Sequence, residues 1–276
     1  MRENKDFCRL CGANATDSVG FSMKNMPSRA QKFSTIKTFS KTMKTDLFFY
    51  QCKYCGLSQL KADPVFYYKQ VFRANNYSES MEKYRKKQFI DFITDNRLKG
   101  KHLLEVGSGP ADNLKILKNL PIKVTGVEFK GKNLVNSENI NEVSDFFDSE
   151  NKLIEGNPFD GFFCFNFLEH IPNPLIFLRA IRNNLKEGSP GIFEVPNFEM
   201  IKKYGVLSEV MLDHLIYFTR ETLLSMLNIS GFKTIKISTN FNDYFLTAHV
   251  KTEKKIISEK VFSNVEKMNQ ELIKNH

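Results

Sequence analysis

The chain has 276 residues, of which 41% are hydrophobic and 26% are charged, and its formal net charge is +9. This length supports a sizeable buried core. No apolar run approaches the roughly 20 residues that a membrane-spanning helix needs, and the charged N-terminus MRENKDFCRL is not a secretory signal, so we expect a cytoplasmic protein. The positive charge suits a nucleic acid, a membrane surface or a phosphate-bearing partner, but base composition explains a lysine-rich chain equally well.

Two C-x2-C pairs lie in the N-terminal part of the chain. The first, CRLC, contains Cys8 and Cys11, the second, CKYC, contains Cys52 and Cys55, and a glycine follows each pair. Four thiolates are the ligands of a tetrahedral structural zinc site, and each C-x2-C turn presents two sulfurs from one tight loop. A disulfide or redox pair is the alternative, which a reducing compartment disfavours. We therefore predict a structural zinc ion and a zinc-binding module over residues 1–62.

The next segments lead from this module into a second domain, which we expect over residues 63–276. The basic segment 24–45 shows no helical period and predicts strands and loops, either solvated or in contact with an anionic substrate or RNA. A linker at 61–69 precedes an amphipathic helix expected over 79–97. Its apolar side contains Met81, Tyr84, Phe89, Phe92 and Ile93.

The segment LLEVGSGPADN, residues 103–113, carries the strongest functional signal. A buried apolar strand runs into a glycine turn where a helix begins, and Gly107 and Gly109 permit a positive φ and close approach of backbone amides to a ligand. A dinucleotide fingerprint would place a third glycine near Asn113, so the NAD-type motif is not met. The acidic-glycine turn E-x-G-x-G, which begins at Glu105, predicts binding of a nucleotide-like cofactor.

Two further strands are expected to end at the same crevice. The strand KVTGVEFK ends near Glu128, at the distance from the turn where a ribose-binding carboxylate lies in nucleotide-binding βαβ units. The apolar run 159–167 predicts a central strand that is buried on both faces. Since ligands of open α/β sheets bind beyond the carboxyl ends of the strands, we expect Asn166, Glu169 and His170 near the cofactor or the acceptor.

Together these segments resemble class I S-adenosylmethionine-dependent methyltransferases. The E-x-G-x-G turn resembles motif I, NFLEHIPNP resembles the fourth motif, and GIFEVPNF resembles the next strand and its exit loop. The resemblance implies a Rossmann-like α/β sheet with helices on both faces and S-adenosylmethionine as cofactor. The residues it places at the cofactor are Glu105, Gly107, Gly109, Glu128, Asn166, Glu169 and His170. Ala111 stands where many members carry a third glycine, and we expect binding to survive this change.

The acceptor side resembles a narrower group, the bacterial sugar methyltransferases with an N-terminal zinc-binding domain, including C-methyltransferases of nucleotide-linked keto-sugars. The segment DHLIYFTRETLLSMLNISGFK, residues 213–233, is similar to the E-H-x-x-Y-F segment of that family, and its spacing from Pro196 agrees. The resemblance implies His214 as general base, Asp213 as the acid that orients its ring, and Tyr77, in NYSES, as an acceptor-side residue.

Two departures from that family bear on the acceptor. Met211 stands where the keto-sugar enzymes carry a tyrosine, and methionine cannot hydrogen-bond an enolate or a sugar hydroxyl. Those enzymes also continue into a large C-terminal domain, whereas here we expect one terminal helix over 253–276 that packs on the domain or on a second subunit of a homo-oligomer. We predict methylation, at oxygen, nitrogen or carbon, of a small anionic acceptor, namely a phosphorylated or nucleotide-activated sugar-type metabolite.

Two alternatives to this function are an RNA base methyltransferase and an inactive S-adenosylmethionine-binding scaffold. Some RNA enzymes also join a cysteine-zinc module to this core, and a basic surface suits a polyanion. However, NFLEHIPNP differs from the aromatic or Asn-Pro-Pro pocket usual in enzymes that flip a base, which disfavours a nucleic-acid partner. The presence of Glu105, Gly107, Glu128 and His214 disfavours an inactive scaffold.

Overall fold

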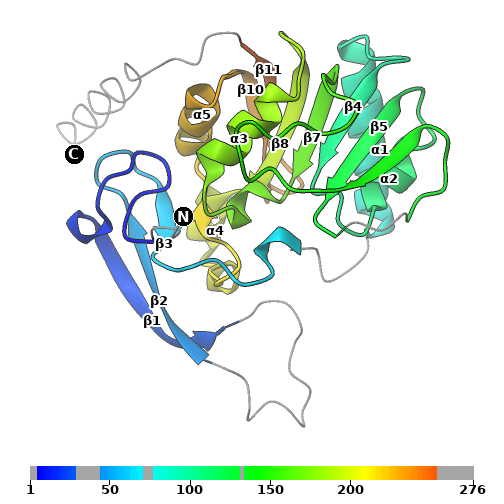
Figure 1. Cartoon of the computed structure of the whole chain (residues 1–276). Coiled ribbons are helices and arrows are strands. Elements are labelled where there is room, and N and C mark those ends of the chain that lie inside the picture. The colour runs from blue at the N-terminus through cyan, green and yellow to red at the C-terminus, as the bar shows by residue number, and fades with distance from the viewer. Residues whose placement is uncertain (1–4, 29–43, 71–76, 131–133, 254–276) are drawn as a thin grey trace.

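A computed structural model describes residues 5–28, 44–70, 77–130 and 134–253 (Figure 1). The expected terminal helix and the homo-oligomer contact proposed for it lie outside these residues, as does most of the basic segment. Within the described ranges, no helix combines the length and the apolar character that crossing a bilayer requires.

The larger of the two sheets in the described residues has seven strands in the order β10-β11-β8-β7-β4-β5-β6. The five strands from β8 to β6 pair in parallel, and β11 runs antiparallel to both β8 and β10. β4 is the first strand of this sheet along the chain. β5 and β6 lie on one side of it, and β7, β8, β11 and β10 lie on the other. The turn after β4 therefore lies at the topological switch point of the sheet. The seven strands are β4 (His102–Val106), β5 (Lys123–Glu128), β6 (Ile140–Ser144), β7 (Gly161–Phe165), β8 (Pro190–Pro196), β10 (Phe232–Asn240) and β11 (Phe245–Thr252).

Helices cover both faces of this sheet, which confirms the predicted Rossmann-like α/β fold. Successive residues of β7 explain why, since Phe162 packs in one buried cluster with α3 and α5, and Phe163 packs in another with α1 and α2. All five residues of β7 are buried, as the apolar run predicted. The helices are α1 (Glu79–Asp95), α2 (Asp112–Leu117), α3 (Pro174–Asn183), α4 (Phe198–Tyr204) and α5 (Arg220–Ile229).

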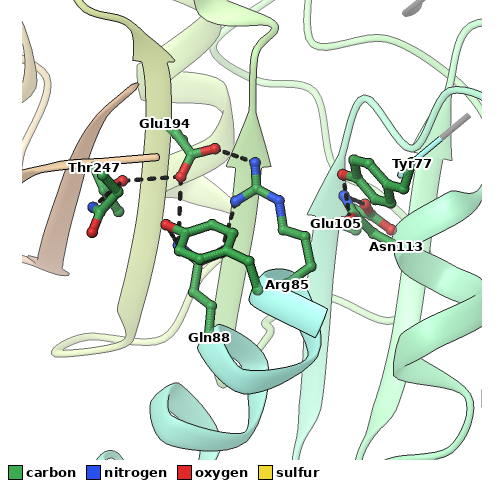
Figure 2. A network of polar contacts seen from close by, with 9 residues as sticks. Tyr77, Arg85, Gln88, Glu105, Asn113, Glu194 and Thr247 are labelled. Atoms are coloured by element: carbon green, nitrogen blue, oxygen red, sulfur yellow. Dashed lines mark hydrogen bonds and ion pairs between the residues drawn. The ribbon is translucent and has the colours of Figure 1, made fainter. Parts of the chain in front are cut away.

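Helix α1 lies where the sequence predicted it, but its buried side differs from the expected one. Ser78 begins the helix by accepting a hydrogen bond from the backbone N–H of Met81. Met81 and Tyr84 are half-buried rather than buried, and the charged side chain of Arg85 is buried instead. The reason lies on β8, where Glu194 is buried opposite Arg85 and forms an ion pair with it (Figure 2).

The N-terminal part forms a second, smaller sheet with the order β1-β2-β3-β9. Three of its strands precede residue 62, namely β1 (Val19–Pro27), β2 (Lys44–Gln51) and β3 (Ser58–Leu60), whereas β9 (Ile216–Tyr217) comes from far along the chain. Figure 1 shows this sheet beside α4, and Leu47, Phe49 and Leu60 pack there in one cluster with Phe198 and Tyr217. The predicted boundary at residue 62 therefore separates two sequence segments that share one sheet.

Candidate active site and cysteine cluster

The glycine turn between β4 and α2 adopts the conformation that its sequence predicts. Gly107 and Gly109 have φ angles of 74° and 52°. The N–H groups of Gly107 and Ser108 both donate to the carbonyl of Val127, at 2.9 and 3.2 Å, which holds the turn against β5. A Cβ at Gly107 would lie 2.9 Å from the ring of Phe167. Conformation and space therefore both require glycine at position 107.

Ala111, which replaces the third glycine of the resembled family, also has a left-handed backbone, with φ 62° and ψ 24°. It is fully buried at the start of α2. A left-handed conformation is one that glycine adopts more readily than alanine, which explains why glycine is common at this position. The turn keeps its shape in this chain with alanine there.

Glu128 ends β5 beside this turn. Its Oε2 accepts a hydrogen bond of 2.9 Å from the N–H of Gly109. Burial raises the pKa of the Glu128 carboxyl to about 7, although the N–H groups of Gly109 and Phe129 oppose this shift. The carboxyl thus stands at the edge of the turn in the position expected of a ribose-binding acid.

A chain of three side chains links the turn to the start of α1 (Figure 2). The hydroxyl of Tyr77 donates to Oδ1 of Asn113 at 2.7 Å, and Nδ2 of Asn113 donates to Oε1 of the buried Glu105 at 2.8 Å. Tyr77 therefore contacts the motif I side of the site. Asn113 is not among the site residues predicted from the sequence, although an amide in the first turn of α2, just after the E-x-G-x-G turn, could have indicated a partner for Glu105.

The chain leaves β7 through Asn166, whose φ is 50° and whose N–H donates to the carbonyl of Glu194 at 2.7 Å. A 3-10 turn (Leu168–His170) then buries both Glu169 and His170. Nδ1 of His170 lies 2.7 Å from the carbonyl oxygen of Asp213. Because a carbonyl only accepts, this contact assigns the ring proton to Nδ1 and leaves the lone pair on Nε2. Burial lowers the pKa of His170 to about 4.

His214 is brought against His170 by the segment that precedes β9. The centroids of the two imidazole rings lie 4.8 Å apart, with the planes inclined by 62°. Burial, together with the neighbouring His170, lowers the pKa of His214 well below its ordinary value. The ring is therefore neutral at physiological pH and is a weaker base than a solvated imidazole.

Asp213 and Glu169 complete this group of polar residues. Asp213 is buried, and its backbone carbonyl accepts the hydrogen bond from Nδ1 of His170. This hydrogen bond orients the ring of His170 rather than the ring of His214. Oε1 of Glu169 lies 3.8 Å from Nε2 of His170. Burial raises the pKa of Glu169 to about 8, so its carboxyl is largely protonated at neutral pH when no cation is near.

The four N-terminal cysteines converge as the zinc prediction requires. Their sulfur atoms all lie within 4.8 Å of one another, with Cys8 and Cys55 at 3.4 Å and Cys11 and Cys52 at 3.5 Å, too long for a disulfide. A tetrahedral zinc ion with Zn–S bonds of about 2.3 Å would hold sulfurs roughly 3.8 Å apart, so the set fits zinc with little movement. The two turns are alike, since the glycine after each pair donates to the carbonyl of its first cysteine.

The fifth cysteine, Cys164, is buried in the middle of β7, away from this cluster. Burial raises the pKa of its thiol well above the ordinary value. It is a core residue.

The sheet order, the reversed strand β11, the glycine turn after β4 and the acid at the end of β5 define the class I methyltransferase fold. A family model described as "Methyltransferase domain" matches residues 77–237, which is more than half of the chain. The protein belongs to this methyltransferase family. No curated protein matches the sequence.

Solved structures share this fold at low sequence identity. An S-adenosylmethionine-dependent methyltransferase from Clostridium acetobutylicum superposes with a TM-score of 0.51 and 15% identity, over 67% of this chain and 96% of that one. The N-methyltransferase NodS from Bradyrhizobium japonicum, in complex with S-adenosyl-L-homocysteine, has a TM-score of 0.47 and 11% identity, over 62% and 86% of the two chains. Magnesium protoporphyrin IX methyltransferase from Synechocystis has a TM-score of 0.48 and 10% identity, over 66% and 90%. At such identities the likeness concerns the fold.

Proposed function

We propose that this enzyme transfers the methyl group of S-adenosylmethionine to a small, phosphorylated or nucleotide-activated sugar-type metabolite. The glycine turn at Gly107 and Gly109 would receive the cofactor, and Glu128 would accept hydrogen bonds from its ribose hydroxyls. Glu105, at the start of this turn, would belong to the same cofactor site. Asn166, Glu169 and His170 follow β7 and would line the boundary between cofactor and acceptor.

The contact between His170 and His214 is the observation that carries this proposal. It brings the segment after β7 against the segment before β9, so that a neutral imidazole lies beside the end of the central strand. His214 would accept a proton from the acceptor while the acceptor atom attacks the methyl carbon. A bond from that atom to the methyl group forms, the sulfonium–methyl bond breaks, and S-adenosylhomocysteine leaves with the electron pair on sulfur.

The nature of the acceptor is supported by the likeness of residues 213–233 to the sugar methyltransferases. Methylation at oxygen or nitrogen fits this chain at least as well as methylation at carbon, because Met211 replaces the tyrosine of the keto-sugar enzymes. The hydroxyl of Tyr217 accepts a hydrogen bond of 3.1 Å from the backbone N–H of Met211 and donates one of 3.3 Å to its carbonyl. This hydroxyl is therefore already hydrogen-bonded within the protein.

The cysteine cluster would hold a structural zinc ion, because four thiolates fill all positions of a tetrahedral ion. Reduced thiolates of this kind fit the cytoplasmic location that the sequence predicts. The zinc ion would stabilise the N-terminal sheet and would take no part in the transfer.

Replacement of His214 by alanine tests the base. We expect His214→Ala to lower the rate of S-adenosylhomocysteine formation about 10²- to 10⁴-fold with a small-molecule extract as acceptor source, while the affinity for S-adenosylmethionine changes little. His249→Gln on β11 is the matched control and should keep full activity. Unchanged turnover in His214→Ala would remove the histidine from the mechanism. An absence of turnover in every form of the protein would favour the inactive scaffold.

A further inference from the structure

Besides the four cysteines, a second group of metal-ligating side chains converges in the described part of the chain. It consists of Glu169 and His170, from the 3-10 turn after β7, and of His214. One carboxylate oxygen and one nitrogen from each ring all lie within 4.8 Å of one another. We propose that these three residues form a binding site for a divalent transition-metal ion of the Zn²⁺ type.

The ring of His170 is held as a metal ligand usually is. Its Nδ1–H donates to the carbonyl of Asp213 at 2.7 Å, which leaves the lone pair on Nε2, an atom that lies 3.8 Å from Oε1 of Glu169. Histidines that bind metals almost always donate the other ring N–H to a carbonyl or carboxylate, which fixes the tautomer and the orientation of the ring. The Asp213 carbonyl supplies this support before any ion binds.

Glu169 supplies a second, independent observation. Its side chain is 2% exposed. Among the described residues, its Oε2 atom is buried without a hydrogen-bond partner. A buried carboxyl oxygen with no partner is unfavourable, and a cation between Glu169 and the two rings would compensate for it. The backbone carbonyl of Glu169 also accepts from the N–H of Leu215 at 2.9 Å, which ties it to the residue after His214.

Two imidazole nitrogens and one carboxylate oxygen select the kind of ion. This set suits zinc and its neighbours in the transition series, whereas Mg²⁺ and Ca²⁺ prefer oxygen ligands alone. Three protein ligands leave a fourth position open, in contrast to the closed set of four cysteines. His214 is half-buried, whereas Glu169 and His170 are buried, so the open position would face the side where His214 reaches the surface.

A metal ion at this site would occupy the lone pair of His214. On the proposed function, in which His214 is the general base, this histidine could then no longer accept a proton from the acceptor. We therefore expect excess Zn²⁺ to inhibit methyl transfer and a chelator of moderate strength to reverse the inhibition. Binding of the ion itself does not depend on that function.

The test is a titration of the zinc-loaded full chain with Co²⁺, followed by visible absorption. A ligand set of nitrogen and oxygen gives ligand-field bands without the sulfur-to-cobalt charge transfer of a four-thiolate site, so the spectrum distinguishes the two clusters. We expect one further equivalent of Co²⁺ with nitrogen and oxygen ligation. Glu169→Gln, which keeps the size of the side chain, and His214→Ala should each weaken it at least tenfold, and His249→Gln should leave it unchanged. Thermal unfolding of each variant shows that the fold is retained.

Two results would overturn the proposed site. One is the absence of a second equivalent in the native protein, and the other is a second equivalent that persists unchanged in both Glu169→Gln and His214→Ala. The activity assay separates this site from the proposed function. If Co²⁺ binds as expected but raises the turnover, the metal site stands and the role of His214 as base is refuted.

Discussion

The backbone N–H of Leu60 donates a hydrogen bond of 3.0 Å to the carbonyl of Leu215. This contact joins β3, which follows the second cysteine pair, to the residue after His214. Arg9, inside the first cysteine pair, also donates to the carbonyls of Leu60 and Ala62, both at 2.8 Å. The cysteine cluster is therefore connected through β3 to the segment that carries the candidate base.

Loss of the metal from the cysteine cluster should consequently impair methyl transfer. We expect Cys52→Ser to lose bound zinc, to lower the melting temperature and to reduce turnover at least tenfold, because β3 would no longer hold the segment 211–217. The affinity for S-adenosylmethionine should change less, since the glycine turn belongs to the other sheet. Metal content, thermal unfolding and turnover measure these effects. Cys164→Ala is the control that should retain zinc, and equal turnover in Cys52→Ser and the native enzyme would refute the coupling.

Gly107→Ala should abolish cofactor binding. The added Cβ would meet the ring of Phe167 at 2.9 Å, and the φ of 74° disfavours alanine as well. Gly188 is a matched control, because its φ is 72° but nothing lies within 4 Å of an added Cβ. Gly188→Ala should cost about 1 kcal/mol of stability and leave the affinity for S-adenosylmethionine unchanged. Isothermal titration calorimetry of both variants with S-adenosylmethionine measures these affinities. Similar affinities in the two variants would show that the turn at Gly107 does not receive the cofactor.

The affinity for S-adenosylmethionine should rise with pH through neutrality. Burial raises the pKa of Glu128 to about 7 in the ligand-free protein, and ribose hydroxyls bind the ionised carboxylate better than the protonated form. The two values pH 6 and pH 8 lie one unit below and one unit above this pKa. Binding should therefore be about tenfold weaker at pH 6 than at pH 8. Glu128→Gln should bind more weakly and without this pH dependence. A native affinity that is equal at pH 6 and pH 8 would contradict the assignment of Glu128.

The buried ion pair between Arg85 and Glu194 should matter for stability far more than an exposed pair on the same helix. Arg85→Met leaves the Glu194 carboxylate buried without its cation and should cost about 3–5 kcal/mol in the free energy of unfolding. The double variant with Glu194→Gln should recover part of this loss. Lys87 pairs with Asp91 on the exposed side of α1, and Lys87→Ala should cost less than about 0.5 kcal/mol. Denaturant unfolding of the native protein and the three variants measures these free energies. Equal losses of stability in Arg85→Met and Lys87→Ala would show that the buried pair matters no more than the exposed one.

Much of the large sheet could be predicted because its signals are local. The run that forms β7 is apolar at successive positions, and the glycines after β4 mark a turn whatever the rest of the chain does. The helix over 79–97 was also predicted from its pattern, and α1 covers Glu79–Asp95. The fold class and the shape of the glycine turn thus followed from short stretches of sequence.

The remaining features depend on contacts between distant segments. Arg85 and Glu194 are 109 positions apart, so neither residue alone indicates that the other will be buried against it. The two-residue strand β9 has no sequence pattern of its own and exists because β3 lies beside it. The lowered pKa of His214 likewise arises from burial and from His170, which the spacing of motifs does not reveal.

The most direct test of the proposed function is the identity of the methylated product. Purified enzyme would be incubated with S-adenosylmethionine that carries a deuterated methyl group, together with a small-molecule extract and total RNA, and the labelled fraction would be identified by mass spectrometry. We expect the label on a sugar phosphate or a nucleotide sugar, and its loss with His214→Ala. Label on RNA alone would contradict the sugar-type acceptor and would assign the N-terminal module to contact with nucleic acid.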